Sequence, residues 1–134
     1  MLQVISSSPG ELSPIFQVML ENATRICEAK LGVLFLWEGQ GQYRVAALHG
    51  ASARLAQERR PGTIIRPPPS TGIGRVASTR QVAHVPDVSV DKNYVDPAPG
   101  YSPAGIVIHA GARTELAVPM LKDDDLVGTI VIYR

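Results

Sequence analysis

The sequence contains a single cysteine, Cys27, among its 134 residues. One cysteine cannot form an internal disulfide, and it cannot supply the several thiolates of a cysteine-rich zinc site. The sequence also lacks an apolar run of about eighteen residues, the length that indicates a membrane-spanning helix, and its N-terminus lacks the basic start and apolar stretch of a signal peptide. We therefore expect a cytoplasmic domain that makes no contact with a membrane.

An excess of charge of either sign is missing as well. Thirteen Lys and Arg residues against twelve Asp and Glu residues give a net charge of +1, so the composition does not indicate a nucleic-acid partner. The charge is unevenly spread, because residues 54–80 contain six arginines and only one acidic residue, Glu58. This segment is either a solvated arginine-rich face or a positive surface for an anionic ligand or an acidic partner.

The pattern of apolar residues predicts one α+β domain, and the length leaves no room for a second. Apolar residues spaced by three and four predict a helix that begins at Ser13-Pro14 and buries a single stripe. Alternating and β-branched runs predict strands, and a proline-rich loop is expected over residues 86–112. The expected elements are a helix at 13–30, a hairpin at 32–38 and 43–49, a helix at 72–80, a strand at 81–85, and a hairpin at 114–121 and 126–133.

Motifs for catalysis and for metal binding are missing or lack their context. Residues 72–77 have the GxGxxA spacing of a dinucleotide-binding loop, but they follow a proline-rich segment and not a buried strand. His49, His84 and His109 are too far apart in the sequence to show the short spacings of paired metal ligands. No signature of a nucleophile with its base occurs. We therefore expect no metal site and no catalytic residues.

Polar residues gather around the predicted loop and suggest a pocket. If the loop folds over one face of the sheet, it closes a cavity with apolar walls and a few polar anchors, the general form of a small-molecule site. The alternative is that these residues are solvated surface groups, because loops are polar in any case. The polar set comprises His84, Asp87, Asp91, Tyr94, Tyr101, His109, Arg113, Thr114 and Glu115.

Three segments together resemble the GAF domain family. They are the helix and strand within residues 12–39, the segment GRVASTRQVAHVPDV at 74–88, and the segment RTELAVPMLKDDDLVGTIVIYR at 113–134. The resemblance spans residues 11–134, with residues 1–10 as a tail or linker. The sequence is similar to the GAF domains of proteobacterial multidomain sensor histidine kinases and nucleotide cyclases. It implies a PAS-related central antiparallel sheet of five to six strands with helices packed on its faces.

The resemblance also implies a function and its limits. It implies a non-catalytic sensory module of a cytoplasmic two-component signalling protein, joined to an output kinase or cyclase domain. The usual helix after the last strand is missing from this sequence, which suggests a piece of a longer protein. The cofactor is unknown, because the cyclic-nucleotide signature is missing and Cys27 is not placed to attach a bilin. Relatives that reduce methionine sulfoxide need several cysteines, which argues against an enzyme.

Two hypotheses remain. In the first, a small molecule binds between the sheet and the segment 84–113 and shifts the helix at 13–30 in a homodimer. In the second, the domain is a ligand-free structural dimerisation module. In the first hypothesis two arginines contact an anionic group, other polar side chains form hydrogen bonds, and apolar walls complete the pocket. The expected ligand-binding residues are Phe35, Arg75, His84, Asp87, Tyr94, His109, Arg113, Glu115 and Val118.

Overall fold

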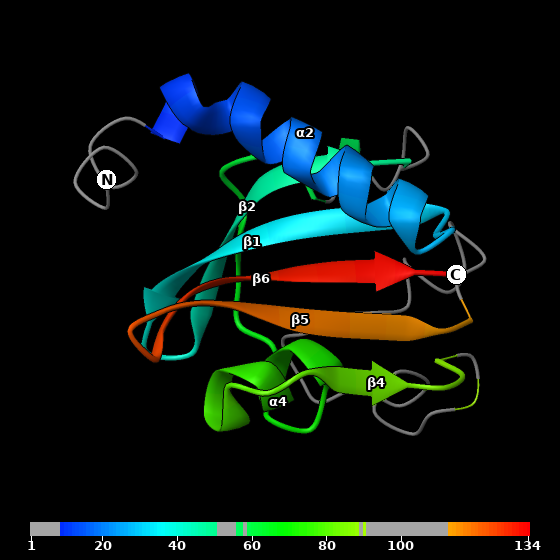
Figure 1. Cartoon of the computed structure of the whole chain (residues 1–134). Coiled ribbons are helices and arrows are strands. Elements are labelled where there is room, and N and C mark those ends of the chain that lie inside the picture. The colour runs from blue at the N-terminus through cyan, green and yellow to red at the C-terminus, as the bar shows by residue number, and fades with distance from the viewer. Residues whose placement is uncertain (1–8, 51–55, 58, 89, 91–112) are drawn as a thin grey trace.

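The computed structural model describes residues 9–50, 56–57, 59–88, 90 and 113–134, with side chains described from residue 14 onward. Along these residues each of two helices is followed by three strands (Figure 1). Strand β3 was not expected from the sequence. The elements are α2 (Pro9–Ile26), β1 (Leu31–Gly39), β2 (Gln42–His49), β3 (Ile64–Ile65), α4 (Gly72–Thr79), β4 (Ala83–Val85), β5 (Glu115–Lys122) and β6 (Asp125–Tyr133).

The strands form one antiparallel sheet in the order β3-β2-β1-β6-β5-β4. Both predicted hairpins are present, as β1–β2 and β5–β6, and β1 pairs with β6 to join them at the centre of the sheet. The predicted class, an α+β domain with a sheet of five to six strands and helices on its faces, is therefore confirmed.

The two hairpin turns depend on left-handed backbone conformations. Gln40 and Gly41 both have positive φ, 55° and 78°, and so do Asp123 and Asp124, 52° and 69°. Two consecutive residues with positive φ are typical of the type I′ turn, whose twist matches that of the flanking strands. Glycine and aspartate tolerate this region better than most residues. Three of the four turn residues therefore agree with the hairpin geometry, and Gln40 is the exception.

Helix α2 differs from the prediction at both ends. It begins at Pro9 and ends at Ile26, so Pro14 lies inside the helix and not at its first position. Glu28, with a φ of 54°, turns the chain out of the helix, and Gly32 belongs to β1. At the sixth helical position Pro14 cannot donate a hydrogen bond to the carbonyl four residues earlier, and its ring crowds that carbonyl, so the proline weakens the first turn of the helix.

The prediction of a single buried stripe on this helix was also wrong. Phe16 and Leu20 are buried against Leu34 and Ala47 of the sheet. Ile15, Met19 and Ile26, which the pattern had placed on the same stripe, are 53%, 40% and 72% exposed. Spacing alone could not separate the two stripes, because both repeat every three or four residues and their members are neighbours in the sequence.

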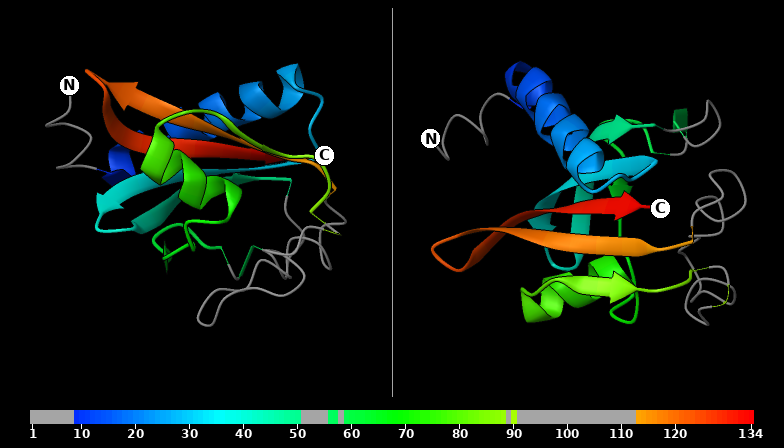
Figure 2. Two further views of the ribbon diagram at one scale, coloured as in Figure 1. Left: turned by 90° about the horizontal axis from the view of Figure 1, so that it is seen from below. Right: turned by 45° about the vertical axis from the view of Figure 1, so that its right-hand side comes forward.

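The opposite face of the sheet carries the larger core. Helix α4 packs there on β4, β5 and β6, so the two helices lie on opposite faces (Figure 2). Thr71 caps α4 by accepting a hydrogen bond from the Gly74 amide at 3.2 Å, and its hydroxyl donates to the Pro68 carbonyl at 2.8 Å. The cap thus ties the start of α4 to the proline-rich segment that precedes it.

Gly74 provides a test of how closely these segments pack. A methyl group at Gly74 would overlap the Pro68 carbonyl oxygen. We therefore expect Gly74→Ala to lower the free energy of unfolding by about 1–3 kcal/mol, the usual cost of overpacking, as measured by urea denaturation. The control is Arg75→Ala, an exposed neighbour expected to change it by less than about 0.5 kcal/mol. Helix propensity alone favours alanine, so stabilisation by Gly74→Ala would contradict the contact.

Candidate functional site

The face of the sheet opposite α2 is lined by rows of inward-pointing side chains. Strand pairing aligns Val33, Val131 and Ala117 in one row across β1, β6 and β5. The next row toward the end of β6 consists of Leu31, Tyr133 and Glu115. All six side chains are at most 4% exposed. The face is therefore an apolar floor with one carboxyl group at its edge.

Tyr43 links this face to helix α4. Its hydroxyl lies 3.0 Å from Thr129 Oγ1 and 3.5 Å from the Ile73 carbonyl oxygen. One phenol can serve both partners by donating to Ile73 and accepting from Thr129. Its ring packs edge-on against Phe35 and Trp37, with centroids 5.9 and 4.9 Å away. Burial raises the pKa of Tyr43 above its ordinary value, and the hydrogen bond from Thr129 lowers it in part.

Glu115 is the buried carboxyl group on this face. It is 1% exposed, and its neighbours across the ladder are Val85 on β4 and Tyr133 on β6. A carboxylate in such surroundings is costly unless hydrogen bonds or charges compensate it. Buried ionisable groups of this kind occur more often at functional sites than elsewhere.

An ion pair lies at the same end of the sheet. The Arg113 guanidinium is 3.4 Å from the Asp87 carboxylate, and both side chains are partly exposed. Backbone bonds hold the two segments together, with the Val88 amide donating to the Arg113 carbonyl at 2.6 Å. The Thr114 hydroxyl donates to the Pro86 carbonyl at 2.9 Å. Asp87, Arg113 and Glu115 are therefore held at one end of the β4–β5 pair.

The sequence-predicted site residues do not form one cluster. Phe35 shares the face of Glu115 but lies on β1, four residues further along the ladder. Arg75 is exposed on α4. Tyr94 and His109 lie outside the described residues. The structure thus brings together three of the predicted residues, with Phe35 further away on the same face.

His84 and Val118 lie on the other face of the sheet. Ala83, Val85 and Ala117 point into the core opposite α2, so the alternation of side chains along a strand turns His84 and Val118 toward the α2 side. Val118 pairs with Ile130, which packs near α2. These two residues cannot line a pocket with Phe35 and Glu115. The prediction that all nine residues line a single pocket therefore fails for His84 and Val118.

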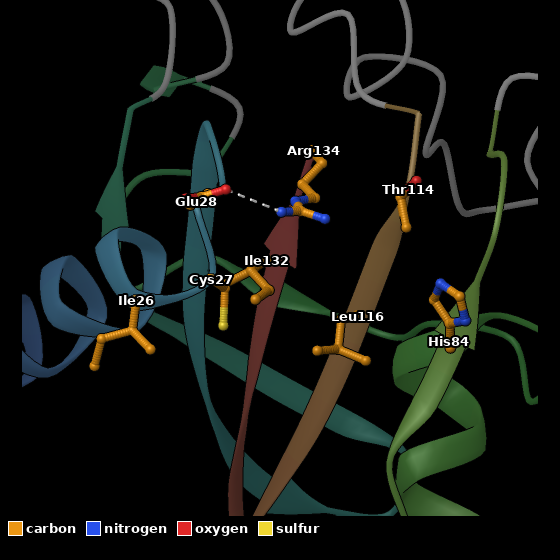
Figure 3. Close-up of a pocket in the computed structure, with 8 residues that line it drawn as sticks. All are labelled: Ile26, Cys27, Glu28, His84, Thr114, Leu116, Ile132 and Arg134. Carbon is orange, nitrogen blue, oxygen red and sulfur yellow. Dashed lines mark ion pairs between the residues drawn. The ribbon is translucent and has the colours of Figure 1, made fainter.

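A groove occupies the α2 side of the same sheet end (Figure 3). It has a volume of about 460 Å³ and lies between the end of α2 and strands β4, β5 and β6. Arg134 reaches across its upper end toward Glu28, at 3.6 Å. Sequence reasoning missed this groove, because it depends on the position of α2 across the sheet. Its lining residues are Ile26, Cys27, Glu28, His84, Thr114, Leu116, Ile132 and Arg134.

Sequence reasoning also missed Tyr43 and Thr129. The two residues are 86 positions apart, and only the pairing of the hairpins brings them together. Within the described part of the chain, no three His, Cys, Asp or Glu side chains are grouped closely enough to hold a metal ion. Neither of the helices described is both long and apolar enough to cross a membrane.

An antiparallel six-stranded sheet with helices on both faces defines an α+β domain. The GAF domain family matches residues 11–134, so the chain belongs to this family of regulatory domains. No curated protein matches it in sequence.

Solved structures with the same fold share little sequence with the chain. The GAF domain of a phosphoenolpyruvate-protein phosphotransferase from Coxiella burnetii is 16% identical, with a TM-score of 0.67 over 99% of this chain and 72% of that one. NreA from Staphylococcus aureus, mutated in its nitrate binding site, is 16% identical, with a TM-score of 0.62 over 90% and 83%. A free methionine-R-sulfoxide reductase from Thermoplasma acidophilum is 13% identical, with a TM-score of 0.61 over 93% and 75%. These similarities establish the fold.

The Tyr43–Thr129 contact can be tested by a double-mutant cycle. Tyr43→Phe and Thr129→Val each leave a buried polar group of the other residue without this bond, so each is expected to lower the free energy of unfolding by about 1–3 kcal/mol. The double variant should cost less than the sum of the two, because it leaves neither group behind. Chemical denaturation of the four proteins measures the coupling. Additive costs would show that the two hydroxyls do not interact.

The raised pKa of Tyr43 predicts a loss of stability at alkaline pH. The unfolded phenol loses its proton near its ordinary pKa of 10.0, whereas the folded phenol keeps it to higher pH. Above about pH 10 the folded state binds more protons than the unfolded state, so the free energy of unfolding falls as the pH rises. We expect Tyr43→Phe to show a shallower fall than the wild type in denaturation series from about pH 9 to 11. Equal slopes would contradict the shift, because the other tyrosines are common to both proteins.

Proposed function

We propose that the chain is a non-catalytic sensory domain that binds a small molecule on the sheet face opposite α2. The observation that supports this most directly is the burial of Glu115, at 1% exposure, beside an apolar floor. A few polar anchors on an otherwise apolar surface are typical of small-molecule sites. We place the site at the end of the β4–β5 pair, where Asp87 and Arg113 lie.

We propose a ligand with hydrogen-bond donors, which would add to the partners that Glu115 already has within the protein. A buried carboxylate is best compensated by N–H or O–H donors or by a positive charge. Arg113 would hold an acidic group of the ligand at the rim, because its side chain is 69% exposed and the ion pair with Asp87 keeps it in position. Phe35 would contribute an apolar wall, and Tyr94 and His109 remain candidate contacts. We leave His84, Val118 and Arg75 out of the site because of where they lie.

We propose that binding is relayed to an output domain of the same polypeptide, a histidine kinase or a nucleotide cyclase in a cytoplasmic signalling protein. A ligand can shift the output only if it binds one arrangement of the domain more tightly than another. Strand β5 is the direct mechanical link, because Glu115 faces the proposed site and Leu116 faces the groove beside α2. A homodimer formed through α2 would pass such a shift along its helices.

The ligand site can be tested by thermal shift and calorimetry. We expect a panel of amino acids, small amines, nucleotides and nitrate to contain a compound that raises the Tm of the wild type, as any ligand specific to the folded state does. Glu115→Gln should then weaken its affinity by about 10- to 100-fold, because a hydrogen bond to a charged group is lost. Val118→Ala is the matched control on the other face of the same strand and should leave the affinity unchanged.

The outcomes separate the site from the function. A ligand whose affinity is unaffected by Glu115→Gln would show that the domain is a sensor with its site elsewhere. The second candidate function, a ligand-free structural dimerisation module, is favoured by the dense packing of the face opposite α2, where fifteen buried residues form one cluster. Native mass spectrometry that finds a dimer without any bound mass, together with a panel that never raises the Tm, would support the second candidate.

A further inference from the structure

The groove on the α2 side of the sheet has an apolar floor and an apolar wall. Leu116 of β5 and Ile132 of β6 form the floor, and Ile26 at the end of α2 forms the wall (Figure 3). Ile26 is 72% exposed, so this wall is in contact with water. The volume of about 460 Å³ lies within the range of roughly 300–1,000 Å³ that small-molecule sites have. The groove therefore has the size and the surface to hold one small molecule.

Strand pairing brings N–H donors together on the strand side of the groove. The Arg134 amide donates to the Thr114 carbonyl oxygen at 2.9 Å, so these two residues are neighbours on adjacent strands. His84 pairs with Leu116, which places it diagonally from Thr114 on the same face. The Thr114 hydroxyl already donates to the Pro86 carbonyl at 2.9 Å. The guanidinium of Arg134 and the imidazole of His84 therefore provide the N–H donors on this side of the groove.

The charges that line the groove favour an anion on the strand side. Arg134 lies 3.6 Å from Glu28, and the two side chains are 60% and 84% exposed. An exposed ion pair of this kind is weak, so a carboxylate above the apolar floor can replace Glu28 as the partner of Arg134. Glu28 and the carboxyl-terminal end of α2 disfavour an anion on the helix side. An anionic head group toward the strands and an apolar chain toward α2 fit both sides.

We propose that the groove is a second ligand site, which binds a small carboxylate with an apolar chain, such as a medium-chain fatty acid. The carboxylate pairs with Arg134 and accepts a hydrogen bond from His84, while the chain covers Leu116 and reaches Ile26. The site lies on the opposite face of the sheet from Glu115, so it goes beyond the proposed function and does not depend on it. A bound molecule joins the end of α2 to β4, β5 and β6.

Cys27 gives a readout that reports on this groove. It is the single cysteine of the chain, it lines the groove, and its sulfur points between Ile26 and Ile132 (Figure 3). With the full chain at constant pH, octanoate should slow the alkylation of Cys27 by iodoacetamide, and the half-maximal concentration gives the affinity. Isothermal titration calorimetry measures the same affinity without the thiol, so the test does not depend on how fast Cys27 reacts.

The length of the chain tests the apolar floor. Hexanoate, octanoate and decanoate, each below its micellar concentration, should bind more tightly by about two- to fourfold for each added methylene group, because each one covers further apolar surface. A rise in Tm with each compound shows that it binds the folded state. Octylamine, which has the same chain and a positive charge, should not protect Cys27.

Charge variants test the head group. Arg134→Gln should weaken octanoate binding by about tenfold and leave octanol binding within about twofold, because the guanidinium contacts the carboxylate. Glu28→Gln should strengthen octanoate binding by about two- to fivefold, because it removes the competing partner of Arg134. Arg75→Gln is the matched control, an exposed arginine on α4, and should change neither affinity. Circular dichroism and the Tm show whether each variant is folded.

Three results would overturn the inference, and they are distinguishable. Carboxylates that neither protect Cys27 nor titrate in the calorimeter would show that the groove binds no such ligand, while leaving the site at Glu115 untouched. Octylamine that binds more tightly than octanoate, and is weakened by Glu28→Gln, would show that the groove prefers a cation. Octanoate binding that Arg134→Gln leaves unchanged in a folded protein would show adsorption to apolar surface without recognition of the carboxylate.

Discussion

The contact on which the arrangement of this domain depends is the buried bond between Tyr43 and Thr129. It joins β2 to β6 across β1, and the second hydrogen-bond partner of the phenol, the Ile73 carbonyl, belongs to α4. The backbone ladders fix the order of the strands but not the position of a helix above them. A directional hydrogen bond in a desolvated environment helps to fix the position of α4, because an unpaired hydroxyl there is costly. This network and the cap at Thr71 thus fix where α4 lies on the face where we place the ligand site.

The two faces of the sheet differ in what packs on them, because successive side chains of a strand point to opposite faces. On β5, Glu115 and Ala117 point to the face covered by α4, and Leu116 points to the groove near α2. A shift of one strand changes both faces at once, since interiors are packed too densely to absorb it locally. A ligand at the proposed site would therefore also affect the packing beside α2, without any long-range pathway of side chains.

The sequence predicted the elements and the class better than it predicted the site. Both hairpins could be found because alternation and turn residues are local signals, and α4 because its pattern is amphipathic. The site residues could not be sorted, since a spacing of one residue decides the face of a strand. His84 and Val118 were assigned to the pocket by their nearness in sequence to Asp87 and Glu115, yet the register places them on the other face. Tyr43 and Thr129 gave no local signal, because their partnership exists only after the hairpins pair.

Helix α2 shows why its two apolar stripes were read as one. Residues 15 and 16, and likewise 19 and 20, are adjacent, so a pattern of apolar pairs fits either one wide buried face or two narrow faces at an angle. The exposures of Ile15 and Met19 decide for the second case. A helix that served only its own sheet would have no need for the outer stripe, and hydrophobic side chains in that position cost solubility. The exposure of Ile15, Met19 and Ile26 leaves an apolar flank on α2, which supports the homodimer proposed above.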